Sequence, residues 1–433
     1  MKNLSRILWG YALYMIGGAF FLMLPIAHKS GVGLPFIDAL FVSASAISTT
    51  GLTPVSAAEF SFIGQVGLMM MLFVGGLGYM TFGAFLALTI HGTLSTQQHG
   101  ILKSAFALPS ELNVKQFVFS TGIYALVVQL LGAFALYFVF QDDPRANPIF
   151  SSLFHSISIF TTAGFSIYPN GVETYVLNTA FNVITIIVAI LGSLGFIVAT
   201  DVASVVRGQR QRLTFTTKII LTMTFGILFV STALVYLFGD YTIGDSWWQT
   251  IMVIMFENTN AMTTSGFSTI NLSQVSIGFL MVLMMILTIG GAPSGTAGGI
   301  KVTTVSAIFA AVHSFTRGSK QTYLMGRKIP DTRVQQAFSN FVIYIVSLVS
   351  GILLLFFIEP DINPLFLMFE AASALGTTGM SAGITSSLTT LAKFVLIVLM
   401  YMGRVGVFTV AAVILVRSRQ RQSSAYADAD VAV

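Results

Sequence analysis

The sequence predicts an all-α polytopic membrane protein, and three observations carry that prediction. Apolar residues make up 55% of the 433 positions, charged residues make up only 9%, and the apolar positions gather in long segments. A soluble domain is about 25% charged, so this chain has too few charges to hydrate the surface of a large soluble protein. The 39 glycines fit the same class, because glycine lets transmembrane helices approach one another closely.

Eight segments are long enough to cross a membrane, which requires roughly 20 mainly apolar residues. They cover approximately residues 6–27, 60–91, 114–140, 175–200, 216–239, 275–313, 335–358 and 389–416. A half-apolar stretch of about 15 residues lies between the first and second spans, and likewise between the third and fourth, the fifth and sixth, and the seventh and eighth. Such stretches are too short to cross and too apolar for ordinary loops, so we expect re-entrant segments.

The basic residues predict the orientation of these spans. With the N-terminus inside, 17 of the 21 Lys and Arg residues are cytoplasmic, three are external and Arg404 lies inside the eighth span. Acidic residues show the opposite bias, with 11 of 16 outside. Cytoplasmic loops of membrane proteins carry an excess of Lys and Arg. We therefore expect both termini in the cytoplasm, and we interpret the net charge of +5 as a topology signal rather than a nucleic-acid footprint.

Each re-entrant stretch ends in Thr-x-Gly followed by an apolar residue. The four copies are Thr49-Thr50-Gly51-Leu52, Thr162-Ala163-Gly164-Phe165, Thr264-Ser265-Gly266-Phe267 and Thr377-Thr378-Gly379-Met380. Their glycines are spaced by 113, 102 and 113 residues. A phenylalanine precedes each glycine by ten residues (Phe41, Phe154, Phe256 and Phe369), and a small polar residue precedes it by six (Ser45, Ser158, Asn260 and Ser373). This common register indicates four internal repeats.

Each repeat is expected to contain a helix, a re-entrant half-helix, a loop and a second helix. The expected boundaries are 1–99, 100–210, 211–325 and 326–416, followed by a cytoplasmic C-terminal tail at 417–433. A further glycine follows the loop glycine by 24 residues in three repeats, at Gly75, Gly290 and Gly403, and the equivalent in the second repeat is Gly192.

The Thr-x-Gly loops predict four pseudo-symmetric repeats around one central pore. Irregular backbone at membrane depth persists where it lines a path for water or ions, and glycine tolerates the positive φ that turns a carbonyl toward an axis. Four such loops would form a ring of carbonyl oxygens that replaces the hydration shell of a cation. The alternative is that these glycines only pack helices closely, but packing alone does not require the threonine or the shared register.

A second unusual segment interrupts the sixth span. It reads Gly290-Gly291-Ala292-Pro293-Ser294-Gly295-Thr296-Ala297-Gly298-Gly299. Glycine costs about 1 kcal/mol and proline about 3 kcal/mol in a helix relative to alanine, so we expect a break at membrane depth with few packing contacts. Arg404 is expected at the same depth, where it would donate hydrogen bonds to the loop carbonyls or repel a cation. A passive kink and a structural arginine clamp are the alternatives.

The fourfold plan and the glycine-rich segment ending in Gly299-Ile300-Lys301 resemble the Trk/Ktr/HKT superfamily of potassium transporters. Eight spans resemble most the bacterial Ktr membrane subunit. The resemblance implies potassium uptake across the bacterial cytoplasmic membrane, a filter at the four Thr-x-Gly loops and a gate at 290–299. It also implies a homodimer, stimulation by sodium, and a separate cytosolic ring that binds ATP or ADP. Glycine rather than serine at Gly51 favours potassium over sodium within this superfamily.

Other functions are weaker interpretations of the sequence. An alternating-access secondary cation transporter also uses broken helices, but its signature is inverted paired repeats. Gly379-Met380-Ser381-Ala382-Gly383 matches the Gly-x-Ser-x-Gly pattern of hydrolases without the strand–turn–helix context, and the chain has no cysteine nucleophile, so we predict no enzyme and no cofactor beyond the transported ion. Glu257 and Glu370 are expected to support the filter, and most of the five histidines to be interfacial or solvated.

Overall fold

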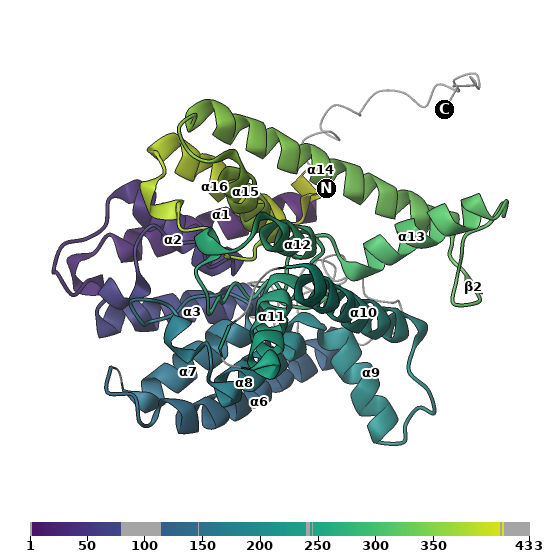
Figure 1. Cartoon of the computed structure of the whole chain (residues 1–433), viewed down its shortest axis with the longest axis horizontal. Coiled ribbons are helices and arrows are strands. Elements are labelled where there is room, and N and C mark those ends of the chain that lie inside the picture. The colour runs from purple at the N-terminus through teal and green to yellow at the C-terminus, as the bar shows by residue number, and fades with distance from the viewer. Residues whose placement is uncertain are drawn as a thin grey trace.

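The described part of the protein folds into a bundle of helices with one short hairpin (Figure 1). The computed structural model describes residues 2–78, 114–145, 147–239, 243–244, 246–407 and 409–410. The helices are α1 (Lys2–Leu22), α2 (Phe36–Ser48), α3 (Phe62–Leu77), α6 (Val114–Phe140), α7 (Pro148–Phe160), α8 (Thr179–Ser193), α9 (Phe196–Val206), α10 (Phe215–Phe238), α11 (Trp247–Met262), α12 (Ile277–Thr288), α13 (Val302–Thr316), α14 (Asp331–Ile358), α15 (Pro364–Gly376) and α16 (Thr390–Val405). Strands β1 (Tyr323–Leu324) and β2 (Arg327–Lys328) pair antiparallel between α13 and α14.

Three helices of the described chain are long and apolar enough to cross a membrane alone. They cover Val118–Phe140, Phe215–Phe238 and Asp331–Ile358, and the bent pair α8 and α9 gives a fourth if it is counted as one span. The other predicted spans contain shorter apolar helices, and parts of two of them, residues 79–91 and 411–416, lie outside the described residues, as do the boundary at 99–100 and the tail at 417–433. The count of eight spans therefore stays a prediction.

The fourth predicted span, residues 175–200, is not one continuous helix. It ends at Ser193, turns at Gly195 and resumes as α9, which is bent by 98° from α8. Gly195 has a φ of +85°, and a Cβ there would lie 2.6 Å from the Pro293 carbonyl oxygen. The close approach of the glycine-rich segment thus forces a turn that the apolar pattern does not reveal.

The four short helices α2, α7, α11 and α15 are buried within the bundle. The phenylalanines noted in the sequence, Phe41, Phe154, Phe256 and Phe369, are all 0% exposed. Asn147 and Asn363 cap α7 and α15 with their side-chain oxygens, each followed by a proline at the first helical position, where the missing N–H has no cost. Ser246 caps α11 in the same way, whereas α2 begins after Pro35 without a side-chain cap. All four short helices are held by apolar contacts along their length.

An ion pair joins the two ends of the chain across the bundle. Lys393 Nζ, near the start of α16, lies 2.7 Å from Asp38 Oδ1 at the start of α2. Among the described residues, α2 packs against α1, α3 and α16. The first and last quarters of the chain are consequently neighbours.

Two histidines are buried, and the expectation that most of the five are interfacial or solvated stays a prediction. His155 Nδ1 lies 2.8 Å from the Ser151 carbonyl oxygen and its Nε2 lies 3.0 Å from Ser166 Oγ. His28 is 7% exposed, with Nε2 2.6 Å from the Leu22 carbonyl oxygen. Each ring contacts a nearby backbone carbonyl, which spacing in the sequence could not indicate. His313 is exposed, and His91 and His99 lie outside the described residues.

Candidate ion-binding site

Each of the four buried short helices ends in the same way. The threonine of Thr-x-Gly adopts the left-handed conformation, with φ of 55° at Thr49, 54° at Thr162, 52° at Thr264 and 50° at Thr377. Its N–H bonds the carbonyl three residues back, and the next N–H bonds the carbonyl five residues back at 2.8 Å in all four copies. This pattern is a Schellman motif in which threonine occupies the position that glycine usually takes.

The four loops contact one another in a closed ring. A Cβ on Gly51 would lie 2.6 Å from the Ala163 carbonyl oxygen, and one on Gly164 would lie 2.8 Å from that of Ser265. A Cβ on Gly266 would lie 2.0 Å from the Thr378 carbonyl oxygen, and one on Gly379 would lie 1.9 Å from that of Thr50. Each glycine therefore leaves room for the backbone of the next loop, and the last loop returns to the first. All twelve predicted filter residues belong to this ring of loops.

The small polar residue six positions before each glycine braces its loop. Ser45 Oγ accepts a hydrogen bond from the Gly51 N–H at 2.9 Å, and Ser373 Oγ does the same for Gly379 at 2.9 Å. Ser158 Oγ instead donates to the Phe165 carbonyl at 2.8 Å. The Asn260 carbonyl accepts hydrogen bonds from the N–H groups of Ser265 and Gly266. These contacts fix the loop backbone from the side of the short helix.

Three polar side chains tie the short helices to the segments that follow the loops. Glu257 Oε1 accepts hydrogen bonds from Thr269, at 2.8 Å from the backbone N–H and 3.0 Å from the hydroxyl. Glu370 Oε1 accepts a hydrogen bond from the Thr385 hydroxyl. His155 reaches Ser166 in the second repeat. These residues lie behind the loops and contact protein groups, so they position the loops.

The ring carries side-chain oxygens in addition to its carbonyls. Thr49 Oγ1 and Thr377 Oγ1 are buried and have no hydrogen-bond partner within the described residues. Ser265 Oγ and Thr378 Oγ1 of the same loops also have none within the described residues. The loops therefore hold side-chain oxygens as well as carbonyls, and oxygen ligands of both kinds can replace the water around a cation.

The segment after α12 lies directly against the ring. The Gly298 N–H donates a hydrogen bond to Thr264 Oγ1 at 3.0 Å, and Thr296 Oγ1 donates to the Phe160 carbonyl at 3.1 Å. Ala292, Thr296 and Ala297 are at most 2% exposed. The break between α12 and α13 lies where the composition predicts it, but the expectation of few packing contacts was wrong, because the loop is buried against neighbouring elements of the bundle.

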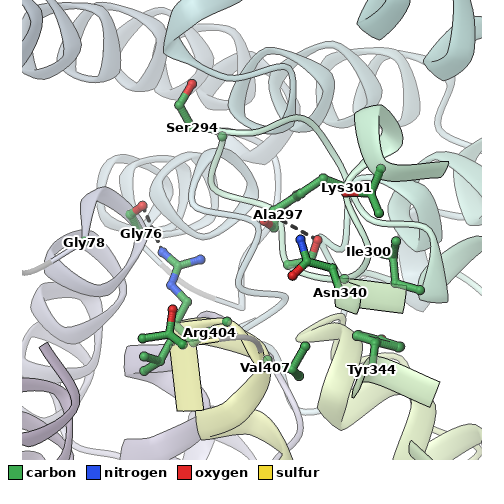
Figure 2. Close-up of a pocket in the computed structure, with 18 of the residues that line it drawn as sticks. Gly76, Gly78, Ser294, Ala297, Ile300, Lys301, Asn340, Tyr344, Arg404 and Val407 are labelled. Carbon is green, nitrogen blue, oxygen red and sulfur yellow. Dashed lines mark hydrogen bonds between the residues drawn. The ribbon is translucent and has the colours of Figure 1, made fainter. Parts of the chain in front are cut away.

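Arg404 links this segment to the first repeat (Figure 2). Its guanidinium donates hydrogen bonds to the carbonyl of Thr296, and on the other side to the carbonyls of Gly75 and Gly76, the latter at 3.0 Å. Its contact with the loop carbonyl agrees with the expected depth. The contact with the end of α3 adds a second anchor that the sequence did not indicate.

Several residues of this region escaped the sequence analysis. Gly78, Gly195 and Gly406 all have positive φ, at 76°, 85° and 95°, and each ends or breaks the helix after a Thr-x-Gly loop. Each of them follows a glycine noted in the sequence (Gly75, Gly192, Gly403) by three residues, so a repeated Gly-x-x-Gly would have revealed them. Lys301 belongs to the glycine-rich motif, and its Nζ donates to the carbonyls of Ala297 and Gly298, a contact that the sequence does not indicate.

The chain matches a family described as TrkH, cation transport protein, over residues 24–426. It belongs to the TrkH family of cation transport proteins. Among its relatives, the Ktr system potassium uptake protein D of Bacillus subtilis is 33% identical, covering 92% of this chain and 90% of the relative. The Ktr system potassium uptake protein B of Vibrio alginolyticus is 31% identical (94% and 90%). The potassium/sodium uptake protein NtpJ of Enterococcus hirae is 30% identical (96% and 93%).

The fold of this TrkH-family member also agrees with a solved structure. The potassium transporter TrkH from Vibrio parahaemolyticus superposes with a TM-score of 0.74 at 19% identity, covering 96% of this chain and 85% of that one. The family and the helical fold confirm a polytopic membrane transporter of the predicted superfamily, and they confirm that the chain is not an enzyme.

Proposed function

We propose that this chain is the ion-translocating subunit of a potassium uptake system and that K⁺ crosses it through the ring of four Thr-x-Gly loops. The single observation that carries the proposal is the closed contact of the four loops, in which every glycine admits the backbone of the next loop. Backbone carbonyls held at such close quarters can replace the water around a dehydrated cation. The unpartnered oxygens of Thr49 and Thr377 add ligands of the same kind.

The proposed architecture is four repeats, with the boundaries given above, and eight spans around one pore. In this arrangement the carboxyl ends of α2, α7, α11 and α15 all converge on the ring, and the partial negative charge of a helix C-terminus favours a cation there. Both termini would be cytoplasmic, and the membrane would be the bacterial cytoplasmic membrane. Four loops that share one chain direction also favour a channel-like path over the inverted repeats of an alternating-access transporter.

The proposed gate is the loop 290–299 together with Arg404. The loop bonds to the ring at Thr264 and to Arg404 at Thr296, so it lies one step beyond the ring along the proposed path. Because the Arg404 contacts are hydrogen bonds to carbonyls at two different elements, they can hold the loop in place and can also be exchanged if it moves.

The proposed partners are a second copy of this chain and a cytosolic nucleotide-binding ring. Relatives bear the name of a Ktr system, and the chain itself carries no P-loop or dinucleotide fingerprint. The basic cytoplasmic segments 207–218 and 317–333 are the proposed docking surface for the ring. We also propose that sodium stimulates transport, as one relative is named a potassium/sodium uptake protein.

A pull-down from native membranes in mild detergent with ATP or ADP tests the proposed partner and should recover the ring. Recovery of no such protein would contradict this part.

Flux into liposomes that contain only the purified chain tests the central proposal. We expect potassium flux well above that of protein-free liposomes and above sodium flux under the same gradient. Equal rates for the two cations would contradict the filter. A rate that follows a saturating transport cycle instead of the electrochemical gradient would favour alternating access.

A further inference from the structure

A cavity of about 380 Å³ lies against the intramembrane loop, on the side that the proposed topology assigns to the cytoplasm. It is bounded by the loop, by the start of α13 and by residues of α1, α14 and α16 (Figure 2). Its polar wall includes Lys301, Thr304, Asn340, Tyr344 and Arg404. No acidic residue is among the described residues that line it. This volume is within the range of small-molecule sites, which is roughly 300–1,000 Å³.

Two cations in this wall have only neutral partners. Lys301 Nζ donates to the carbonyls of Ala297 and Gly298, and Arg404 donates to those of Thr296, Gly75 and Gly76. Neither takes part in a salt bridge within the described chain. Charges that are withdrawn from water are costly unless an opposite charge is near. The cavity therefore places two positive charges together without a protein anion to compensate them.

A third group in the wall has no partner at all. Tyr344 lines the cavity and is 3% exposed, and its buried hydroxyl makes no hydrogen bond within the described structure. A tyrosine hydroxyl is both a donor and an acceptor, an ammonium has three donors and a guanidinium has five. Lys301 and Arg404 thus retain N–H groups in addition to those that donate hydrogen bonds to the carbonyls. The Asn340 amide adds a further donor to the wall.

We propose that this cavity binds a phosphate group, supplied either by a lipid headgroup or by free phosphate. Phosphate offers several acceptor oxygens and negative charge, which match ammonium, guanidinium and hydroxyl donors on different walls. A single halide ion would fill little of the space. The consequence for transport rests on the proposed gate: phosphate held by the remaining N–H groups of Lys301 and Arg404 competes with the loop carbonyls for both side chains, so its binding loosens the loop and raises flux.

Thermal unfolding of the full-length chain in detergent tests the binding directly. One arm adds inorganic phosphate against chloride at equal ionic strength. The second adds dioctanoyl phosphatidylglycerol against dioctanoylglycerol, which has no phosphate. We expect the unfolding midpoint to rise by about 2 °C at a hundred-fold excess over the Kd. A rise with inorganic phosphate identifies a soluble ligand, and a rise with the phospholipid alone identifies a headgroup; both support the site.

Variants locate the effect within the cavity. Lys301→Gln and Tyr344→Phe should each weaken phosphate affinity, Lys301→Gln by roughly tenfold because it removes a charge-assisted hydrogen bond. Tyr168→Phe is the matched control, since it deletes another buried hydroxyl that has no partner and is not part of the cavity wall. No rise with either ligand, or equal rises in wild type and both cavity variants, would overturn the proposal.

Measuring potassium flux distinguishes a failure of the phosphate site from a failure of the proposed transport function. If liposomes show selective potassium flux but the ligands neither bind nor change it, the anion site is wrong and the potassium pathway stands. If the ligands bind as expected in a chain that conducts no potassium, the site stands and the proposed transport function fails.

Discussion

Thr49, Thr162, Thr264 and Thr377 adopt a backbone conformation that β-branched residues disfavour. They account for four of the six non-glycine residues with positive φ in the described chain. Such strain persists where the surroundings over-determine it and is concentrated at functional sites. Here the two Schellman hydrogen bonds, which recur in all four copies, hold each threonine in place. We infer that the threonine is retained for its side-chain oxygen, because glycine would satisfy the backbone without strain.

The glycines of the ring give the sharpest test at the residue scale. We expect Gly379→Ala to abolish potassium selectivity or to prevent folding, because the new Cβ would lie 1.9 Å from the Thr50 carbonyl oxygen. Gly383→Ala is the matched control: its φ is +85°, similar to the +87° of Gly379, but nothing lies within 4 Å of the Cβ. Both variants carry the penalty of about 1–2 kcal/mol for placing a residue with a Cβ at positive φ. The ratio of potassium to sodium flux in liposomes distinguishes them, and an equal effect of both changes would contradict the ring.

A second residue-scale prediction concerns the hydroxyl behind the ring. Ser373→Ala removes the acceptor of the Gly379 N–H hydrogen bond at 2.9 Å. We expect a loss of about 1 kcal/mol of local stability and a lower ratio of potassium to sodium flux. Ser387→Ala is a suitable control, because Ser387 is exposed and its hydroxyl bonds only the Ile384 carbonyl. Unchanged selectivity in the Ser373 variant would show that the loop holds its shape without this brace.

At the scale of elements, the intramembrane loop and the end of α16 work as one unit. The loop is buried and bonded to the ring through Thr264 and to Arg404 through Thr296. An element so well packed does not open by simple local disorder. If the loop is the gate, it must exchange its present hydrogen bonds for others when it moves. The Arg404 N–H groups that now donate to the loop then need another acceptor.

Shortening the loop tests its role as the gate. We expect deletion within Ala292 to Gly298 to raise potassium flux and to free it from regulation, while selectivity is retained. Arg404→Ala should raise flux in the same direction but less. Arg404→Lys is the control, because it keeps the charge but cannot bridge Thr296 and Gly76 with a planar fork. A deletion variant that folds normally and shows unchanged flux would mean that the segment is a passive break.

A polar cluster outside the membrane-spanning segments orders the loop after α6. Asp143 and Arg145 form an ion pair, Arg145 bonds the Thr174 hydroxyl at 2.8 Å, and its guanidinium lies 4.8 Å from the centre of the Tyr168 ring. The side-chain hydrogen bonds from Arg145 are the largest cause that lowers the pKa of Asp143 below its ordinary value. The carboxylate is thus favoured in the folded state.

This cluster predicts a pH dependence of stability. A carboxyl group with a lowered pKa contributes stability that is fully present above its unfolded pKa, 3.8 here, and is lost progressively as the pH falls below that value toward the lower folded pKa. We therefore expect the unfolding midpoint of the wild type to fall more between pH 6 and pH 3 than that of Asp143→Asn, which lacks the titrating group. Parallel falls in the two proteins would exclude a contribution from this pair.

On the scale of the whole molecule, the chain closes on itself. α16 packs against α1 and α2, and the Gly379 loop returns to the Thr50 carbonyl. The Lys393–Asp38 ion pair joins the starts of α16 and α2 in the same contact, with side chains 11% and 19% exposed. Without this closure the ring would have an open side.

A double-mutant cycle measures what the ion pair adds to closure. We expect Lys393→Gln and Asp38→Asn each to lower the free energy of unfolding. The coupling between them should be about 0.5–1 kcal/mol and should decrease with salt, because the pair is only partly buried. Lys29→Gln, which removes another cation from the side that the proposed topology places outside, is the control. A coupling of zero would mean that apolar contacts alone close the bundle.

The sequence by itself determined the membrane class, the superfamily and the position of every Thr-x-Gly loop. These properties are local: apolar length, the alternation of half-helices with loops, and a motif repeated in register. It also located the break between α12 and α13, because five glycines and a proline cannot form a stable helix.

Only the tertiary structure decided how the loops meet and what holds them. The ring depends on contacts between residues more than 100 positions apart, such as Gly51 with Ala163 and Gly379 with Thr50, and no local pattern specifies such pairs. The turn at Gly195 arises because Pro293 of another element approaches it. The second anchor of Arg404 on the end of α3 likewise exists only because the chain's two ends pack together. Periodicity records which residues are apolar or flexible, whereas the partner of each backbone group is fixed by the packing of the whole bundle.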